Sequence, residues 1–316
     1  MIGIAFARAP SNIQPQLECA WEAALFAQMP IVPCEECPAP ETAVSATPVF
    51  ETLPLVVEGN SKVVRRWSSS VVLIKLKPTV YSYTHNRSGV VEGSDEVRAR
   101  FTALIYDRMG RELAPKFCAP IHAFLGLIEG RDGPLLAQRE VDACNLEVRV
   151  KRYHVGSPLH RYRQTELYAS TQECGPIVKW SRFETPVVCF DWRHPTFDEH
   201  GNRLSDEPLS DDYAAVWMED VPYAKALARE AFLWMERIFE SAGITLIDIC
   251  FFIDRTGRLI YGEISPDCMR ARIGTGPVSD LTSLDKDVWR QGLSSQQLLE
   301  RYQKLFDVLS KESRYA

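Results

Sequence analysis

Short apolar and alternating runs, separated by turn residues, dominate the first half of the chain and predict β-strands. The expected strands cover residues 54–58, 62–67, 70–77, 121–128, 135–139 and 146–153. Later, the apolar run 245–253 and the run 258–264 flank turn residues at 254–257, a pattern typical of a β-hairpin. The chain is therefore expected to be rich in antiparallel strands.

Three segments carry apolar residues at the spacing of one helix face. They cover residues 94–109, 223–242 and 295–309, and a shorter candidate lies at 17–29. The segment 158–222 has a polar, irregular pattern that predicts long loops, and loops of such length are often functional. Strands followed by mixed elements indicate an α+β protein with two lobes.

Composition divides the chain further. Residues 1–48 are rich in Pro and Ala and are expected to form an N-terminal extension. The two lobes are then expected to cover residues 49–145 and 146–316, the second ending in the terminal helix.

Charge and hydropathy exclude several classes of protein. The chain has 316 residues and a net charge of -6, which argues against a general nucleic-acid binder. Apolar runs fall short of the ~20 residues that cross a bilayer, and the N-terminus lacks a secretory pattern, so we expect a cytoplasmic protein without membrane contact. The nine scattered cysteines are expected to be reduced thiols, and Cys34 and Cys37 have no second pair at zinc-finger spacing.

The segment 262–270 packs two acids, a Ser and an Arg into nine residues where the predicted hairpin leaves its sheet. Such groups can meet an anionic ligand or a metal, although a solvated turn with a local Asp-Arg pair remains open. Lys62 follows a glycine turn at 58–61, whose backbone could approach a phosphate, although most such turns only reverse the chain.

The predicted strand 146–153 carries a charged row. Glu147, Arg149 and Lys151 alternate and so share one face, and the strand runs on to Gly156 and Ser157. Cationic and hydroxyl donors would therefore converge at the strand end. A solvent-facing strand with harmless charges is the alternative.

In this order, the motifs at 59–62, 150–157 and 262–270 resemble those of the SAICAR synthetase family, over residues 54–310. The family patterns are roughly Gly-Lys-Ala-Lys, Val-Val-Arg-Asn-x-x-Ala-Gly-Ser and Asp-Glu-x-Ser-Pro-Asp-x-x-Arg. The segment 284–290 is similar to the family's Leu-Asp-Lys-Asp-x-x-Arg. The resemblance implies a two-lobed α+β fold similar to ATP-grasp enzymes, with a nucleotide-binding first lobe and a ribotide-binding second lobe.

The resemblance also implies chemistry. Family members use ATP and Mg²⁺ to activate the carboxylate of an aminoimidazole ribotide, so that the amine of aspartate can attack it. Carried over by motif, the ATP-binding residues are Gly59, Ser61 and Lys62. The ribotide-binding residues are Glu147, Lys151, Ser157, Ser265 and Arg270. The catalytic residues are Asp248, Glu263 and Asp267, with Glu263 also a metal ligand.

The chain departs from the family pattern mainly on its acidic side. Where the family strand has Asp, Lys and Glu at alternate positions, this chain has Asp248, Cys250 and Phe252. Gly262 replaces an Asp, and the segment 78–85 has no acid where the family has an Asp-x-x-Ala-Gly-Asp-Gly loop. These losses remove carboxylates from the usual ATP–Mg²⁺ arrangement. The phosphoribosyl side is better preserved.

Three functions follow as hypotheses. The favoured one is a divergent enzyme of nucleoside-antibiotic biosynthesis, of the coformycin or formycin type, that forms an amide or closes a ring on a phosphoribosyl heterocycle. The second is the housekeeping ligase, with compensating acids from the long middle loop: Asp206, Glu207, Asp211 or Asp212. The third is a non-catalytic ribotide-binding protein. The expected partner is a small-molecule ribotide, and a homo-oligomer is compatible with the sequence.

Overall fold

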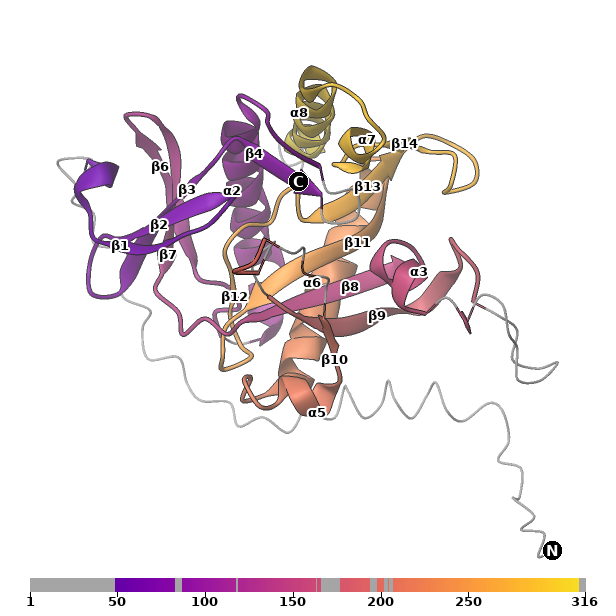
Figure 1. The fold of residues 1–316 in the computed structure, drawn as a ribbon, viewed down its shortest axis with the longest axis horizontal. Coiled ribbons are helices and arrows are strands. Elements are labelled where there is room, and N and C mark those ends of the chain that lie inside the picture. Colours follow the sequence, from indigo (N-terminus) through magenta and orange to yellow (C-terminus); the bar gives the residue numbers. More distant parts are fainter. Residues whose placement is uncertain are drawn as a thin grey trace, which may run out of the picture. The chain divides into compact units, whose positions relative to one another are not determined.

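The computed structural model describes residues 49–82, 87–117, 119–162, 164–165, 177–193, 198–201, 204 and 207–312. They belong to one compact unit that spans residues 42–316. Within it, two larger antiparallel sheets lie side by side (Figure 1). The predicted extension 1–48, its helix candidate at 17–29 and the Cys34 and Cys37 pair lie outside the described residues.

The smaller sheet has five strands in the order β1-β2-β3-β7-β6. Their bounds are β1 (Leu55–Glu58), β2 (Lys62–Arg66), β3 (Val71–Leu76), β6 (Phe124–Gly130) and β7 (Gly133–Arg139). Helix α2 (Ser94–Glu112) packs across β3, β6 and β7. Its apolar stripe, which includes Phe101, Ile105 and Met109, is fully buried. The short helices η1 (Phe50–Thr52) and η2 (Ala114–Phe117) flank these elements in the chain.

The larger sheet has seven strands in the order β10-β9-β8-β11-β13-β14, with β12 paired to β11. Their bounds are β8 (Leu146–Tyr153), β9 (Arg182–Trp192), β10 (Glu207–Leu209), β11 (Ile244–Ile253), β12 (Ile260–Tyr261), β13 (Met269–Ile273) and β14 (Thr282–Ser283). Helix α6 (Val221–Ser241) covers one face, and the buried pair of Arg152 on β8 and Glu236 on α6 marks that face (Figure 1). Because side chains alternate along a strand, Arg149 and Lys151 point to the opposite face.

The C-terminal helix returns to the first sheet's side of the molecule. Helix α8 (Ser295–Glu312) packs against α2. Together with the hairpin β4 (Thr79–Ser82) and β5 (Arg87–Val90) and the short helix α7 (Asp287–Arg290), α8 builds a core cluster. The buried members of this cluster are Val80, Val91, Val97, Val288, Trp289, Leu298 and Tyr302. The predicted second lobe thus ends in a helix that shares its core with the predicted first lobe.

The prediction of loops over 158–222 is wrong in part. Strand β9 occupies residues 182–192 and pairs with β8 along most of its length. Pro186 lies within β9, where the register between β8 and β9 shifts, because Pro cannot donate to the ladder. The short helices α3 (Ser157–Arg161) and α5 (Asp211–Ala214) also fall in this segment.

None of the helices in the described part of the chain has the length and apolar content that a bilayer crossing needs. The four cysteines that the structure describes are free thiols: Cys144, Cys189, Cys250 and Cys268.

Candidate active site

The face of the large sheet opposite α6 carries the charged row that the sequence predicts. On this face Lys151 of β8 stands directly opposite Asp248 of β11, and Arg149 stands opposite Cys250. Glu147 accepts a hydrogen bond from Arg149 at 3.1 Å and one from the Cys250 thiol at 3.4 Å. The strand predicted to hold a ribotide and the first strand of the hairpin therefore lie side by side.

Asp248 is the centre of a buried cation cluster. Its Oδ2 lies 2.7 Å from Lys151 Nζ and 2.6 Å from Arg270 Nη1. Burial alone would raise the pKa of Asp248, but the charges of Arg270 and Lys151 outweigh burial and lower this pKa to about 2. Asp287 lies 3.4 Å from Arg270 on its other side. Three predicted site residues, Asp248, Lys151 and Arg270, are thus brought together.

This cluster predicts a pH dependence of stability. The pKa of Asp248 is lower in the folded chain than its unfolded value of about 3.9. The ionised carboxylate therefore contributes fully to the free energy of unfolding above about pH 3.9, and this contribution is lost as the pH falls toward 2. The contribution at pH 7 is about 2–3 kcal/mol, and about half of it should be lost at pH 3. The difference in free energy of unfolding between the wild type and Asp248→Asn, measured by urea denaturation, should therefore shrink from pH 5 to pH 3. A difference that stays constant would contradict the assignment.

The end of β8 passes close to Arg270. Gly156 has φ +78°, and a Cβ at this position would lie 2.8 Å from both terminal nitrogens of the Arg270 guanidinium. Lys151 Nζ also donates to the carbonyl of Val155 at 3.3 Å. Ser157 begins α3, and its side chain is outside the described part of the structure. The backbone at 155–157 and two cations therefore form one corner of the site.

Replacing Gly156 by Ala is expected to lower the free energy of unfolding by about 1–3 kcal/mol, because the added Cβ would strain the backbone and displace Arg270. Gly201 is the matched control, since it also has φ +78° but has open space around it. Urea denaturation should show a smaller cost for Gly201→Ala. Equal costs would mean that Arg270 does not constrain this turn.

The end of the hairpin forms a second buried network. Arg98 of α2 donates to both carboxylate oxygens of Glu263, from Nε at 2.7 Å and from Nη2 at 2.9 Å. The Ser265 hydroxyl also donates to Glu263, and it accepts the backbone N–H of Asp267 at 3.1 Å. Burial opposes ionisation of Glu263, but Arg98 keeps its pKa below the ordinary value.

Asp267 completes this network from the other side. Its carboxylate accepts from Lys286 Nζ and from the hydroxyl of Tyr302 on α8, both at 3.0 Å. The pKa of Asp267 is lowered, since Lys286 and Arg98 outweigh burial. Three predicted residues, Glu263, Ser265 and Asp267, therefore join the hairpin end to α2 and α8. Arg98 and Tyr302 complete the network, and neither was predicted from the sequence as a site residue.

The acids of this network do not make a magnesium site as they stand. Magnesium needs several oxygen ligands in octahedral geometry. Both oxygens of Glu263 are engaged by Arg98, and Asp267 is engaged by Lys286 and Tyr302. Across the described residues, no group of three or more His, Cys, Asp or Glu side chains could hold a metal. The metal role of Glu263 stays a prediction from sequence.

The predicted nucleotide-binding turn connects β1 and β2 of the smaller sheet. The Gly59 N–H donates to the carbonyl of Lys62 at 2.9 Å, and the Ser61 carbonyl accepts the N–H of Lys77 at 2.8 Å, so this backbone serves the sheet. The Lys62 side chain instead crosses to the larger sheet, where its Nζ lies 4.8 Å from the ring centre of Phe252. Of the three predicted residues, Lys62 is the one that reaches the charged face.

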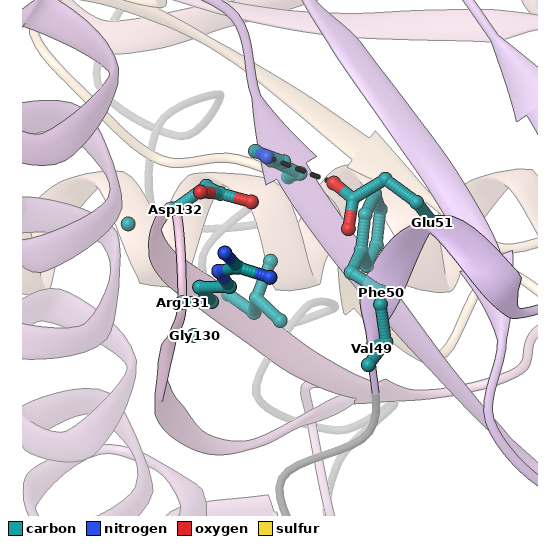
Figure 2. A pocket seen from close by; sticks show the side chains of 9 residues that line it. Val49, Phe50, Glu51, Gly130, Arg131 and Asp132 are labelled. Atoms are coloured by element: carbon teal, nitrogen blue, oxygen red, sulfur yellow. Dashed lines mark hydrogen bonds and ion pairs between the residues drawn. The ribbon is translucent and has the colours of Figure 1, made fainter.

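A separate hollow lies at the edge of the smaller sheet (Figure 2). Phe50, Arg131 and Leu135 are among its lining residues, and Glu51 at its rim pairs with Lys75 at 3.1 Å. No predicted site residue lines it. The candidate active site is therefore assigned to the charged face and not to this hollow.

The two antiparallel sheets define an α+β protein, and the charged face and cation cluster of the larger sheet suit an anionic small molecule. The chain belongs to the SAICAR synthetase family, whose model matches residues 55–306. The predicted family and fold class are confirmed.

Two curated relatives are similar to parts of the chain. The bifunctional cordycepin biosynthesis cluster protein 3 of Cordyceps militaris is 27% identical over 296 residues, which cover 80% of this chain and 32% of that protein. The phosphoribosylaminoimidazole-succinocarboxamide synthase of Methanoregula boonei is 30% identical over 166 residues, which cover 52% of this chain and 57% of that protein. The chain therefore spans about a third of the first relative and just over half of the second.

Solved structures show the same fold at low identity. The phosphoribosylaminoimidazole-succinocarboxamide synthase of Ehrlichia chaffeensis has a TM-score of 0.64 and 17% identity, covering 81% of this chain and 98% of its own. A SAICAR synthetase in complex with ADP has a TM-score of 0.62 and 19% identity, covering 81% and 97%. The Saccharomyces cerevisiae SAICAR synthase complexed with SAICAR has a TM-score of 0.63 and 15% identity, covering 85% and 98%.

Proposed function

We propose that the chain is a divergent SAICAR synthetase-like ligase of nucleoside-antibiotic biosynthesis, which uses ATP to form an amide or close a ring on a phosphoribosyl heterocycle. One observation carries the proposal. The cation cluster of Lys151, Asp248 and Arg270 is intact at the strand end, while Cys250 and Phe252 continue the same face without charge. In this proposal, the phosphate-binding residues are retained, and the neighbouring residues at positions 250 and 252, where the reaction would take place, have changed.

The proposed phosphate position is the corner formed by Lys151, Arg270 and the backbone at 155–157. A phosphate dianion is best bound by cations and by N–H or O–H donors, and an Arg fork can donate two bonds to it. Asp248 orients both cations, through a contact of 2.7 Å with Lys151 and one of 2.6 Å with Arg270. Glu147, half-buried on the same face, is proposed to lie beside the ring or ribose.

The curated relatives support different parts of this proposal. The relative from Cordyceps militaris is named for cordycepin biosynthesis, which supports a role in a nucleoside pathway. The relative from Methanoregula boonei and the neighbour bound to ADP support an ATP-dependent ligase of this family. The heterocycle, the acceptor amine and the use of Mg²⁺ belong to the proposal alone.

The housekeeping ligase is the second candidate, and one observation weighs against its compensating acids. Asp211 pairs with Lys225 of α6 at 2.7 Å, and α6 covers the face of the sheet opposite the site. Glu207 and Asp212 are exposed on β10 and α5, and Asp206 lies outside the described residues. A non-catalytic ribotide-binding protein would share the phosphate corner and lack turnover.

An assay with ATP, Mg²⁺, aspartate and carboxyaminoimidazole ribotide tests the proposal. We expect the ribotide to bind in a calorimetric titration and little or no succinocarboxamide to form, because Cys250 and Phe252 have replaced charged groups. Efficient succinocarboxamide formation would instead make the housekeeping ligase the main role. If the chain binds the ribotide but does not bind ATP under any condition, the non-catalytic ribotide-binding protein is the hypothesis that remains.

A further inference from the structure

A second group of cations surrounds Phe252, away from the Asp248 cluster. The guanidinium carbon of Arg193, which directly follows β9, lies 4.4 Å from the centre of the Phe252 ring. Lys62 Nζ from β2 of the other sheet lies 4.8 Å from the same centre. All three residues are half-buried. Strands from both sheets thus deliver two cations to one aromatic ring.

Within the described part of the chain, these two cations lack ion-pair partners of their own. Among the ion pairs of the described residues, none includes Lys62 or Arg193. The nearest carboxylate that acts on Lys62 is Glu263, and Arg98 already binds both oxygens of Glu263. The neighbouring Cys268 thiol adds no charge, because burial raises its pKa to about 12. Lys62 and Arg98 therefore share the Glu263 carboxylate, and the charge of Arg193 also acts on Lys62.

Tyr261 adds a hydroxyl donor to this group. Tyr261 stands opposite Phe252 in the hairpin, with the ring centres 6.0 Å apart. The Tyr261 hydroxyl is buried and has no hydrogen-bond partner among the described residues, and burial raises its pKa to about 12. The hydroxyl stays protonated near neutral pH and can donate to an anion.

Phe252 and Lys62 occupy the space into which a side chain at position 262 would extend. Gly262 has φ +80°, and a Cβ there would lie 3.2 Å from the Phe252 ring and 3.5 Å from Lys62 Nζ. Gln138 also holds the Gly262 backbone through two hydrogen bonds of 2.7 and 2.8 Å. The local structure therefore presents positive charge where a metal-binding acid would have to stand.

We infer that Lys62 and Arg193, over Phe252, form a site that binds a phosphoryl group of a nucleotide directly, without a divalent ion held by protein carboxylates. The inference rests on the proposed function, because that function supplies the nucleotide. A dianionic phosphoryl group would favour the charged form of Lys62, whose pKa burial lowers, and the Arg193 fork and the Tyr261 hydroxyl could donate to several of its oxygens. Lys62 contributes a point charge from the opposite sheet, so a bound phosphoryl group links the two sheets.

Arg258 shows what a purely structural arginine on a ring looks like in this fold. Its guanidinium carbon lies 4.6 Å from the centre of the Tyr223 ring, and its charge is paired with Asp220 at 3.0 Å. Arg193 has the same kind of ring contact and no such carboxylate among the described residues. Arg258→Ala is therefore the matched control for Arg193→Ala.

Calorimetric titration of the full chain with ADP, in EDTA and separately in excess Mg²⁺, tests the inference. We expect metal-free ADP to bind at least as tightly as ADP with Mg²⁺. Arg193→Ala should weaken metal-free binding by roughly tenfold or more, the range for a hydrogen bond to a charged group. Arg193→Lys should lose less, since it keeps the charge without the fork. Arg258→Ala should change the affinity by less than about twofold, and thermal unfolding should confirm that each variant is folded.

Competing anions identify the source of the phosphoryl group. Inorganic pyrophosphate should displace metal-free ADP, and ribose 5-phosphate should not, because its proposed place is the separate corner at Arg270. Phe252→Glu should weaken metal-free ADP binding by roughly tenfold and make binding depend on Mg²⁺, since it adds an acid between the two cations.

The outcomes separate this inference from the proposed function. Binding of ADP only with Mg²⁺, or an unchanged affinity in Arg193→Ala, would overturn the inference and leave the proposed ligase intact. Binding under neither condition would overturn both. Displacement of ADP by ribose 5-phosphate would show that the nucleotide occupies the ribotide corner, and would also overturn the inference.

Discussion

Replacing Arg98 by Met should lower the free energy of unfolding by about 3–5 kcal/mol, the cost of removing one partner from a buried ion pair. The Arg98 side chain is 0% exposed and that of Glu263 is 5% exposed, so the variant would leave the carboxylate buried without its cation. Arg98 Nη1 also donates to the carbonyl of Lys77 at 3.0 Å, and this bond would be lost. Urea unfolding monitored by circular dichroism measures the change.

The chain offers a matched control for this replacement. Arg66 makes a similar two-pronged contact with Glu140, but these side chains are 49% and 28% exposed. Arg66→Met should therefore cost at most about 1 kcal/mol. Replacing both Arg98 and Glu263 by Met should recover much of the loss, because no uncompensated charge remains. If Arg98→Met and Arg66→Met lower the free energy of unfolding by similar amounts, the buried pair of Arg98 and Glu263 does not have the stabilising role assigned to it.

Replacing Arg270 by Ala should weaken binding of a ribotide by about 2–3 kcal/mol, which corresponds to roughly 30- to 150-fold in affinity. The variant removes a charge-assisted donor and also leaves Asp248 and Asp287 without this cation. Two carboxylates would then face the incoming phosphate with less compensation. Calorimetric titration measures the loss.

Two further variants qualify the Arg270 result. Arg270→Lys should retain part of the affinity, since it keeps the charge but loses the fork. Arg100 is partly exposed and pairs with Glu96 and Glu129, away from the Asp248 cluster, so Arg100→Ala should leave the affinity unchanged. If Arg270→Ala binds the ribotide as well as the wild type does, the phosphate position is wrong.

Much of the fold could be predicted from periodicity alone. The expected helices at 94–109, 223–242 and 295–309 lie within three residues of α2, α6 and α8 at both ends, because each carries a continuous apolar stripe. Strand β9 was missed, because Pro186 and the polar residues around it break the alternation on which the prediction depends. Pairing along β8, and not local propensity, makes that segment a strand.

The candidate site divides in the same way. Lys151 and Asp248 could be placed by alternation and by motif, because their contact follows from strand pairing. Arg193 and Tyr302 carry no local signal, since their partners lie far away in the sequence. Arg98 had one signal: a charged residue within the apolar stripe of a predicted helix usually has a buried partner. That partner, Glu263, could not be identified before the fold brought α2 to the hairpin.

Family membership and remodelled chemistry are compatible in this chain. The Asp248 cluster offers the cations that the proposed phosphoribosyl substrate would need. Phe252 and Gly262 change the part of the site where the nucleotide and the reacting groups are proposed to meet.

The most direct test of the central claim compares a ribotide with the same riboside lacking its 5′-phosphate, titrated into the full chain by calorimetry. We expect the ribotide to bind at least about 100-fold more tightly, because Lys151 and Arg270 would contact the phosphate. We also expect this preference to fall sharply in Arg270→Ala. Equal affinity of the wild type for ribotide and riboside would contradict the claim that this face of the sheet holds a phosphoribosyl group.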